Sequence, residues 1–218
     1  GSVVANLLAN EEIKRRESEK SILLSFSNEM AAVRDKEDLL QVVKKKLNDL
    51  FSVSGFGIAL INRDTKTQSA FLLEVEEKYR KHPDFKDVTT QEYIIADGVF
   101  ARVMHSDDPT MINVSELPDD LQTPAYVRFW KNADIRFVIG VALRVSGSNL
   151  GCLLFHGDPD RIDKLNQNLL KGVCSQISIA LSNIIANKKV VDQLALINRY
   201  KEQLEKEKHY LQEEISSS

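Results

Sequence analysis

The sequence predicts an α+β domain: a central antiparallel sheet of five or six strands with the terminal helices on one of its faces. Apolar residues recur at helical spacing near both ends of the 218-residue chain and alternate with a period of two in its middle. The clearest strands, 135–145 and 149–156, are joined by Ser146-Gly147-Ser148, which predicts a hairpin with a three-residue loop. Terminal helices then cover one face, and the long crossover of residues 76–134 crosses the other.

The first helical segment changes character along its length. Residues 9–21 are almost wholly polar, so this part has too few apolar side chains to lie in a core. We therefore interpret residues 1–20 as a connecting helix. Asp35 and Asp38 form an N-cap pattern before a second, amphipathic helix. Its apolar face consists of Leu39, Leu40, Val43, Leu47 and Leu50.

Short elements are expected between residues 53 and 134. Phe56, Ile58 and Leu60 share one face of a strand at 53–61, and glycine and alanine keep its other face flat. The other expected elements are a strand at 68–75, a loop or short helix at 76–92, strands at 93–95 and 110–112, a short helix at 99–105, and a helix after Pro124.

A long helix is expected from Ile162 to Ile215. Its apolar face is wide up to residue 187, as in a helix packed on a sheet, and then narrows to a heptad-like seam. We interpret residues 21–187 as the globular domain and 188–218 as a coiled-coil linker to an output domain. Such a seam is typical of a two-stranded coiled coil, although Lys201, Glu207 and Lys208 weaken it. The seam residues are Val190, Leu194, Ile197, Leu204, Leu211 and Ile215.

Composition excludes several classes of protein. The formal net charge is -3, and the basic stretches lie within helical patterns, which argues against a nucleic-acid-binding surface. The sequence shows neither a signal peptide nor a run of 18 apolar residues, which argues against membrane insertion and secretion. The two cysteines, Cys152 and Cys174, form no CxxC pair and favour a reducing compartment. We therefore expect a cytoplasmic protein.

Two segments of the chain resemble each other. Residues 5–13 and 182–190 share three of their nine residues, and in both a polar helix follows an apolar one. Short segments of Ala, Leu and Asn also recur by chance. We favour homology, in which residues 3–13 are the last helix of a preceding copy of the same domain.

Catalytic and metal-binding motifs are lacking in the sequence. It contains no phosphate-binding loop, no HExxH and no GxSxG, and its four histidines are scattered over different elements. Cys152 lies on an apolar strand face, where a thiol is unreactive. We expect a protein that is not an enzyme and has no metal site, and no cofactor is indicated.

Aromatic and polar residues of the crossover form a candidate ligand pocket. Aromatic walls with a few polar groups suit a small molecule. Alternatively, the aromatic side chains simply fill a second core. The candidate residues are Tyr93, Asp97, Phe100, Tyr126, Trp130, Arg136 and His156.

The order of these segments resembles the GAF domain, whose fold is related to that of PAS domains. The resemblance covers about residues 20–187, and its segments are 97–99, 107–113, 135–143, 150–154 and 174–183. It implies a six-stranded antiparallel sheet, terminal helices on one face, a ligand pocket on the other, and dimers through the terminal helices. The signatures of cyclic-nucleotide-binding, bilin-attaching and methionine sulfoxide reductase members are absent.

The last segment resembles a more particular group. Residues 204–215 are similar to the linker that enters the AAA+ ATPase of sigma-54-dependent transcriptional activators of the formate-hydrogenlyase-activator type. The resemblance implies a bacterial sensor that controls this ATPase. A sensor of a histidine kinase or nucleotide cyclase stays open as an alternative, as does a ligand-free dimerisation module.

Overall fold

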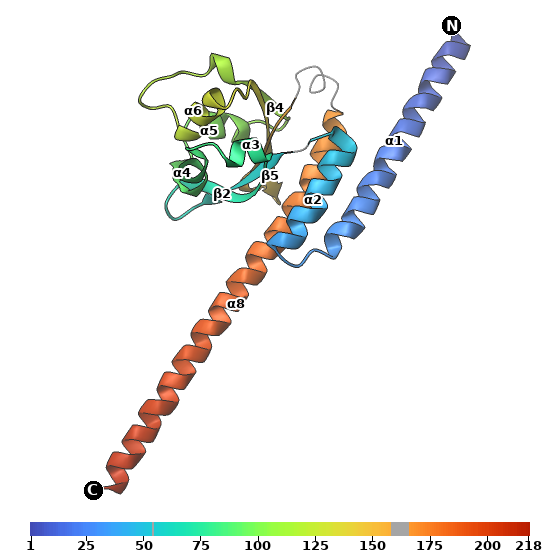
Figure 1. Ribbon diagram of the computed structural model, residues 1–218. Coiled ribbons are helices and arrows are strands. Elements are labelled where there is room, and N and C mark those ends of the chain that lie inside the picture. Colours follow the sequence, from blue (N-terminus) through green and yellow to red (C-terminus); the bar gives the residue numbers. More distant parts are fainter. Residues whose placement is uncertain (54, 158–165) are drawn as a thin grey trace. The chain divides into compact units, whose positions relative to one another are not determined.

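The computed structural model describes residues 1–53, 55–157 and 166–218 (Figure 1). These residues form two compact units, Gly1–Ala180 and Leu181–Ser218. The long helix α8, Gln167–Ser216, passes from the first unit into the second.

The first unit is built on a six-stranded antiparallel sheet, which confirms the α+β architecture expected from the alternating pattern. The strand order is β3-β2-β1-β6-β5-β4. The strands are β1 Phe56–Asn62, β2 Thr67–Glu74, β3 Glu92–Ile94, β4 Thr110–Asn113, β5 Phe137–Val145 and β6 Ser148–His156.

The strand register shows which residues lie on each face of the sheet. Ile58 pairs with Leu153, which pairs with Val141, and all three are buried on one face. The neighbouring row, Ala59, Cys152 and Ala142, belongs to the apolar cluster on the opposite face. Both faces of the central strands are therefore covered, which explains why β5 is apolar at nearly every position.

Terminal helices form one layer. These are α1, Ser2–Ala31, α2, Lys36–Phe51, and the first turns of α8. Asp35 caps α2, because its Oδ1 accepts a hydrogen bond from the Asp38 amide at 2.9 Å, as the sequence predicts. Gly172 allows α8 to approach α1, since a Cβ there would lie 2.6 Å from Leu23 Cδ1. Phe26, Leu47, Leu170 and Ile177 are fully buried in this layer.

Short helices form the other layer, between β2 and β5. Residues 76–92, expected as a loop or short helix, contain two helices. The 3-10 turn η1, which the sequence did not indicate, begins at Asn113, whose side chain accepts a hydrogen bond from the Ser115 amide. Helix α6 follows Pro124, as expected. The helices are α3 Glu77–Arg80, α4 Phe85–Thr90, α5 Val99–Met104, η1 Val114–Glu116 and α6 Ala125–Asn132.

The boundary between β5 and β6 differs from the sequence expectation. The β5–β6 loop has two residues and not three, because Ser148 already pairs with Val145. Ser146 and Gly147 both have positive φ, 49° and 76°, as a two-residue loop that matches strand twist requires. The expected start of the long helix at Ile162, and Leu165, lie outside the described residues.

The second unit is the distal part of α8. All of its expected seam residues are exposed, including Val190 at 53% and Leu204 at 65%.

One stretch of α8 is long and apolar enough to cross a membrane, with a mean hydropathy of 1.4. Core helices of globular domains share this property, and 44% of that stretch is buried within the protein.

Candidate ligand-binding site

An apolar cavity of about 150 Å³ lies between the sheet and the layer of short helices. β1, β2, β5 and β6 supply its floor, and α3 to α6 supply its walls. A cavity of this size accommodates a single aromatic ring. Its lining consists of Phe56, Gly57, Ile58, Ala59, Gln68, Ala70, Leu73, Val75, Tyr79, Phe85, Val88, Thr89, Tyr93, Val99, Phe100, Tyr126, Phe129, Trp130, Ile135, Val138, Cys152, Leu154, Phe155 and His156.

Asp97 organises one wall of the cavity. Its Oδ1 accepts hydrogen bonds from the backbone amides of Val99 at 3.0 Å and Phe100 at 2.7 Å, which fixes the start of α5. Its Oδ2 accepts a bond from the Tyr126 hydroxyl at 2.5 Å and so ties α5 to α6. Burial raises the pKa of Asp97, and the bonds from Tyr126 and the two amides oppose that rise.

Three aromatic rings form a continuous wall. Tyr93 meets Tyr126 edge to face with 4.9 Å between ring centroids, and Tyr126 meets Trp130 at the same separation. The Tyr93 hydroxyl donates to the Val88 carbonyl at 2.8 Å. Burial raises the pKa of Tyr93 to about 12, so this phenol is neutral at physiological pH. The wall is therefore apolar, and its hydroxyl protons are already bonded.

His156 stands at the end of β6, against Tyr79 of α3. The two rings are edge to face, with centroids 5.0 Å apart. Burial lowers the pKa of His156, so the imidazole is neutral at pH 7. Its Nε2 is buried and, among the described residues, is the one buried side-chain nitrogen or oxygen that has no hydrogen-bond partner.

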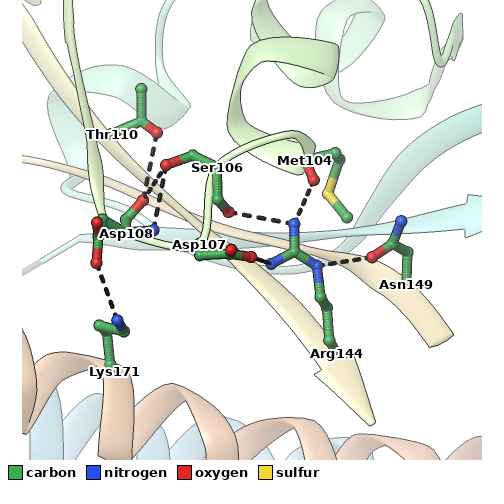
Figure 2. A network of polar contacts seen from close by, with 8 residues as sticks. All are labelled: Met104, Ser106, Asp107, Asp108, Thr110, Arg144, Asn149 and Lys171. Carbon is green, nitrogen blue, oxygen red and sulfur yellow. Dashed lines mark hydrogen bonds and ion pairs between the residues drawn. The ribbon is translucent and has the colours of Figure 1, made fainter. Parts of the chain in front are cut away.

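A polar network joins the C-terminal end of α5 and the loop that follows it to α8 (Figure 2). The Arg144 guanidinium of β5 donates to the carbonyls of Met104 and Ser106, pairs with Asp107 at 3.0 Å, and bonds Asn149 at 2.8 Å. These contacts hold the loop that follows α5.

The same loop reaches the exit helix. Asp108 pairs with Lys171 of α8 at 2.9 Å, and the Ser106 hydroxyl donates to the Asp108 carbonyl at 2.8 Å (Figure 2). Lys171 belongs to the first unit. A continuous set of contacts therefore runs from Phe100 in the cavity, along α5, to α8.

The structure brings together most residues of the candidate pocket. Five line the cavity: Tyr93, Phe100, Tyr126, Trp130 and His156. Asp97 lies behind Tyr126 and supports the wall without lining the cavity. Whether these residues bind a ligand stays a prediction.

Arg136 does not reach the cavity. Its side chain is 76% exposed and lies 3.5 Å from Asp134. Ile135, the preceding residue, lines the cavity, and neighbouring residues of an extended segment point in opposite directions. The expectation for Arg136 is therefore corrected.

Sequence reasoning missed other parts of the site. Tyr79 lies in the charged stretch 76–92, whose sequence shows no clear helical period. Its place in the site is evident only from the structure, where its ring contacts that of His156. Gln68, which is buried, starts an alternating strand at a position where a polar residue suggests exposure. Lys171 and Arg144 carried no sequence signal, because their partners lie 63 and 37 residues away.

The sequence of residues 35–181 matches the GAF domain family. The chain belongs to the GAF family. This stretch includes the whole sheet, the cavity and the first part of α8. The fold is therefore that of a signal-sensing domain found in varied regulatory proteins.

Solved GAF-like structures share this fold at low sequence identity. The GAF domain of a phosphoenolpyruvate-protein phosphotransferase from Coxiella burnetii has a TM-score of 0.55, is 14% identical, and is matched over 78% of this chain and 96% of that one. The GAF domain of a sensor histidine kinase from Bacillus halodurans has a TM-score of 0.53 at 9% identity, over 72% and 99%.

A third structure comes from a transcription factor. The N-acylhomoserine-lactone-dependent LuxR-family factor CepR2 from Burkholderia cenocepacia has a TM-score of 0.51 at 16% identity, over 78% of this chain and 97% of that one. The sequence matches no curated protein significantly. These likenesses establish the GAF fold.

Proposed function

We propose that this GAF domain is a sensor that couples occupancy of its cavity to the exit helix α8 and so controls an output domain. The observation that carries the proposal is the connection from the cavity wall to Lys171. Phe100 of α5 lines the cavity, and the loop after α5 pairs with α8 through Asp108. A ligand that displaces α5 would therefore alter the position of α8.

The connection from α5 to α8 consists of a strong set of contacts, made by Arg144, and a weak one, the pair of Asp108 with Lys171. Arg144 is largely sheltered and bonds two carbonyls of the loop, so the loop moves together with the end of α5. The contact between Asp108 and Lys171 is an exposed ion pair, which contributes little to stability. A contact that contributes little to stability is suited to a switch. A ligand needs only a modest difference in affinity between the paired and unpaired states to shift the equilibrium between them.

Replacing Lys171 with alanine is expected to free the loop without unfolding the domain. The melting temperature should fall by at most about 3 °C, because exposed ion pairs contribute up to about 1 kcal/mol. Hydrogen exchange of the Asp108 amide, which donates to Ser106 Oγ, should accelerate by up to about fivefold. Lys171→Arg keeps the charge and should exchange like the wild type. Equal exchange in all three proteins would show that Lys171 does not hold the loop.

The output domain that we favour is the AAA+ ATPase of a sigma-54-dependent transcriptional activator. The support is the resemblance of residues 204–215 to the linker that enters such ATPases. The reading frame of the full-length gene tests this directly. A phosphate-binding GxxxxGK[ST] motif after the linker is the expected result. A histidine-containing dimerisation helix or a cyclase domain there would assign the sensor to the alternative output.

The homodimer is proposed through the terminal helices. The seam residues of α8 recur with alternating spacings of four and three, and Lys201 and Lys208 occupy two positions of that series. Exposed apolar residues on one stripe of a helix need a partner, and a second copy of the chain supplies the matching stripe.

Leu204→Lys tests the seam. A charge among apolar seam residues should raise the dimer dissociation constant about tenfold or more. Gln203→Lys adds the same charge one residue away, outside the seam, and should leave the constant unchanged. Sedimentation equilibrium over a dilution series measures all three proteins. Equal dissociation constants for both variants would exclude this seam as the dimer contact.

A regulatory role is also favoured over catalysis. Burial raises the pKa of the Cys152 thiol and raises that of Cys174 to about 12, so neither is a nucleophilic thiolate at pH 7. Within residues 1–53, 55–157 and 166–218, no cluster of His, Cys, Asp and Glu suits a metal ion. We propose a cytoplasmic protein that acts on its output domain without direct contact to nucleic acid or membrane.

Native mass spectrometry of the purified chain tests the sensor proposal. A dimer that carries an added small-molecule mass is the expected result. A bare dimer would favour the ligand-free dimerisation module. A bare monomer would contradict dimerisation through these helices at the concentration measured.

A further inference from the structure

The cavity lining carries almost no electrostatic charge. Of the described residues that line it, none is Lys, Arg, Asp or Glu. The Asp97 carboxylate is close by, but it is occupied by the Tyr126 hydroxyl and two backbone amides. An ionic ligand would lose its hydration on entry and gain no opposite charge, which is strongly unfavourable. The cavity therefore selects against ions.

Hydrogen-bonding groups of the lining are mostly engaged with the protein. The Tyr93 hydroxyl donates to Val88 and the Thr89 hydroxyl to Phe85, each at 2.8 Å. The Tyr126 hydroxyl donates to Asp97. Such groups offer little to a ligand unless a native bond breaks. The apolar walls alone would accept a hydrocarbon, and polar recognition must come from another atom.

His156 supplies a candidate atom. This residue lines the cavity, and its Nε2 is buried and has no hydrogen-bond partner among the described residues. A buried polar atom without a partner is unfavourable, so a ligand that bonds it gains affinity from satisfying it. A neutral imidazole offers one donor and one acceptor nitrogen, and therefore matches an uncharged polar group.

The walls favour a planar ring. Tyr93, Tyr126 and Trp130 form edge-to-face contacts in series, and Tyr79 meets His156 in the same way. Aromatic walls bind another aromatic ring through offset and edge-to-face contacts worth more than the buried area alone. The volume of about 150 Å³ admits one ring with a small substituent.

We infer that the cavity binds a small uncharged aromatic molecule with one hydrogen-bonding substituent, and that His156 Nε2 recognises this substituent. The inference rests on the proposed sensor function and narrows its ligand. It separates this cavity from sites for nucleotides or carboxylates, which need cationic side chains.

Four ring compounds of similar size test the inference on the full 218-residue chain: toluene, phenol, benzoate and benzylamine, with the last two charged at pH 7.5. Titration followed by NMR gives each dissociation constant. Phenol should bind about tenfold more tightly than toluene, as one added hydrogen bond predicts. Benzoate and benzylammonium should bind at least about tenfold more weakly than phenol.

His156→Leu isolates the polar contact. Removing an unpartnered buried atom should keep the fold or stabilise it, and the melting temperature checks this. The tenfold preference for phenol over toluene should vanish in this variant, while toluene affinity stays within about twofold. Ala59→Leu, which fills the cavity floor, should abolish binding of both compounds and thereby locate them.

Three outcomes would overturn the inference: benzoate or benzylammonium binding as tightly as phenol, a preference for phenol that survives His156→Leu, or no binding of any ring compound. The sensor proposal fails separately. If native mass spectrometry shows a bound molecule that none of the ring compounds displaces, the sensor function stands and the aromatic class is wrong.

Discussion

Replacing Gly151 with alanine is expected to destabilise the GAF domain by at least about 3 kcal/mol. Gly151 lies in β6 and pairs with Leu60 of β1 and Leu143 of β5, so both neighbours are strands. The β5–β6 register shifts immediately beside it, between Leu143 and Arg144. A Cβ at position 151 would lie 1.8 Å from the Ala59 carbonyl oxygen, which belongs to the backbone and cannot rotate away. Glycine at such a site permits the close approach of two strands.

Urea denaturation followed by far-UV circular dichroism measures the loss. A loss of 3 kcal/mol corresponds to a melting temperature lower by roughly 10 °C in a domain of this size. Gly157→Ala is the matched control, because a Cβ there meets no atom within 4 Å. Its stability should stay within about 0.5 kcal/mol of the wild type. A Gly151→Ala protein as stable as this control would contradict the prediction. It would show that β1 can move away from β6 far enough to make room for the added methyl group without loss of stability.

The fold could be predicted because each layer has its own apolar period. Apolar residues recur at helical spacing at both ends of the chain and alternate in strands such as 137–145. These two periods indicate which side of each helix and strand faces the core. The β5–β6 loop was one residue too long in that prediction, because Ser148 is compatible with either a turn or a strand end. Such boundaries depend on pairing with a partner strand, which local sequence does not encode.

The candidate site was predictable only in part. Tyr126 and Trp130 stood out because large aromatic residues in a crossover need an apolar surface to cover. Arg136 was misplaced, since a shift of one residue along an extended segment reverses the direction of the side chain. The unpartnered Nε2 of His156 and the pair of Asp108 with Lys171 arise from tertiary packing between distant segments, so no local pattern announces them.

Removing the Asp97 carboxylate is expected to destabilise the domain by about 2–4 kcal/mol. This one side chain accepts from the amides of Val99 and Phe100 and from the Tyr126 hydroxyl. In Asp97→Ala the sheltered hydroxyl loses its acceptor, at about 1–3 kcal/mol, and the first two amides of α5 lose theirs, at about 1 kcal/mol. Urea denaturation at pH 7 measures the sum.

Asp97→Asn separates the charge from the hydrogen bonds. Burial raises the pKa of Asp97 even though Tyr126, Phe100 and Val99 donate to it, so the site disfavours the ionised form. The neutral amide avoids that desolvation and keeps an acceptor, and its stability at pH 7 should lie within about 1 kcal/mol of the wild type. The folded wild type binds more protons than the unfolded chain between the usual pKa of 3.8 and the raised value. Its Asp97-dependent stability therefore falls as pH rises through that window, and the Asn variant should lack this fall.

A double-mutant cycle with Tyr126→Phe assigns the loss to the contact between α5 and α6. Phenylalanine keeps the ring against Tyr93 and Trp130 but removes the donor to Asp97. In this background Asp97→Ala leaves no hydroxyl without an acceptor, so its cost should shrink by at least about 1 kcal/mol. Additive losses would mean that Asp97 stabilises the domain without coupling to Tyr126, for example through the first amides of α5. Non-additive losses would identify the Asp97–Tyr126 hydrogen bond as a contact that holds α5 and α6, two wall helices of the cavity, together. A ligand that pushes α5 away from α6 would then strain this bond.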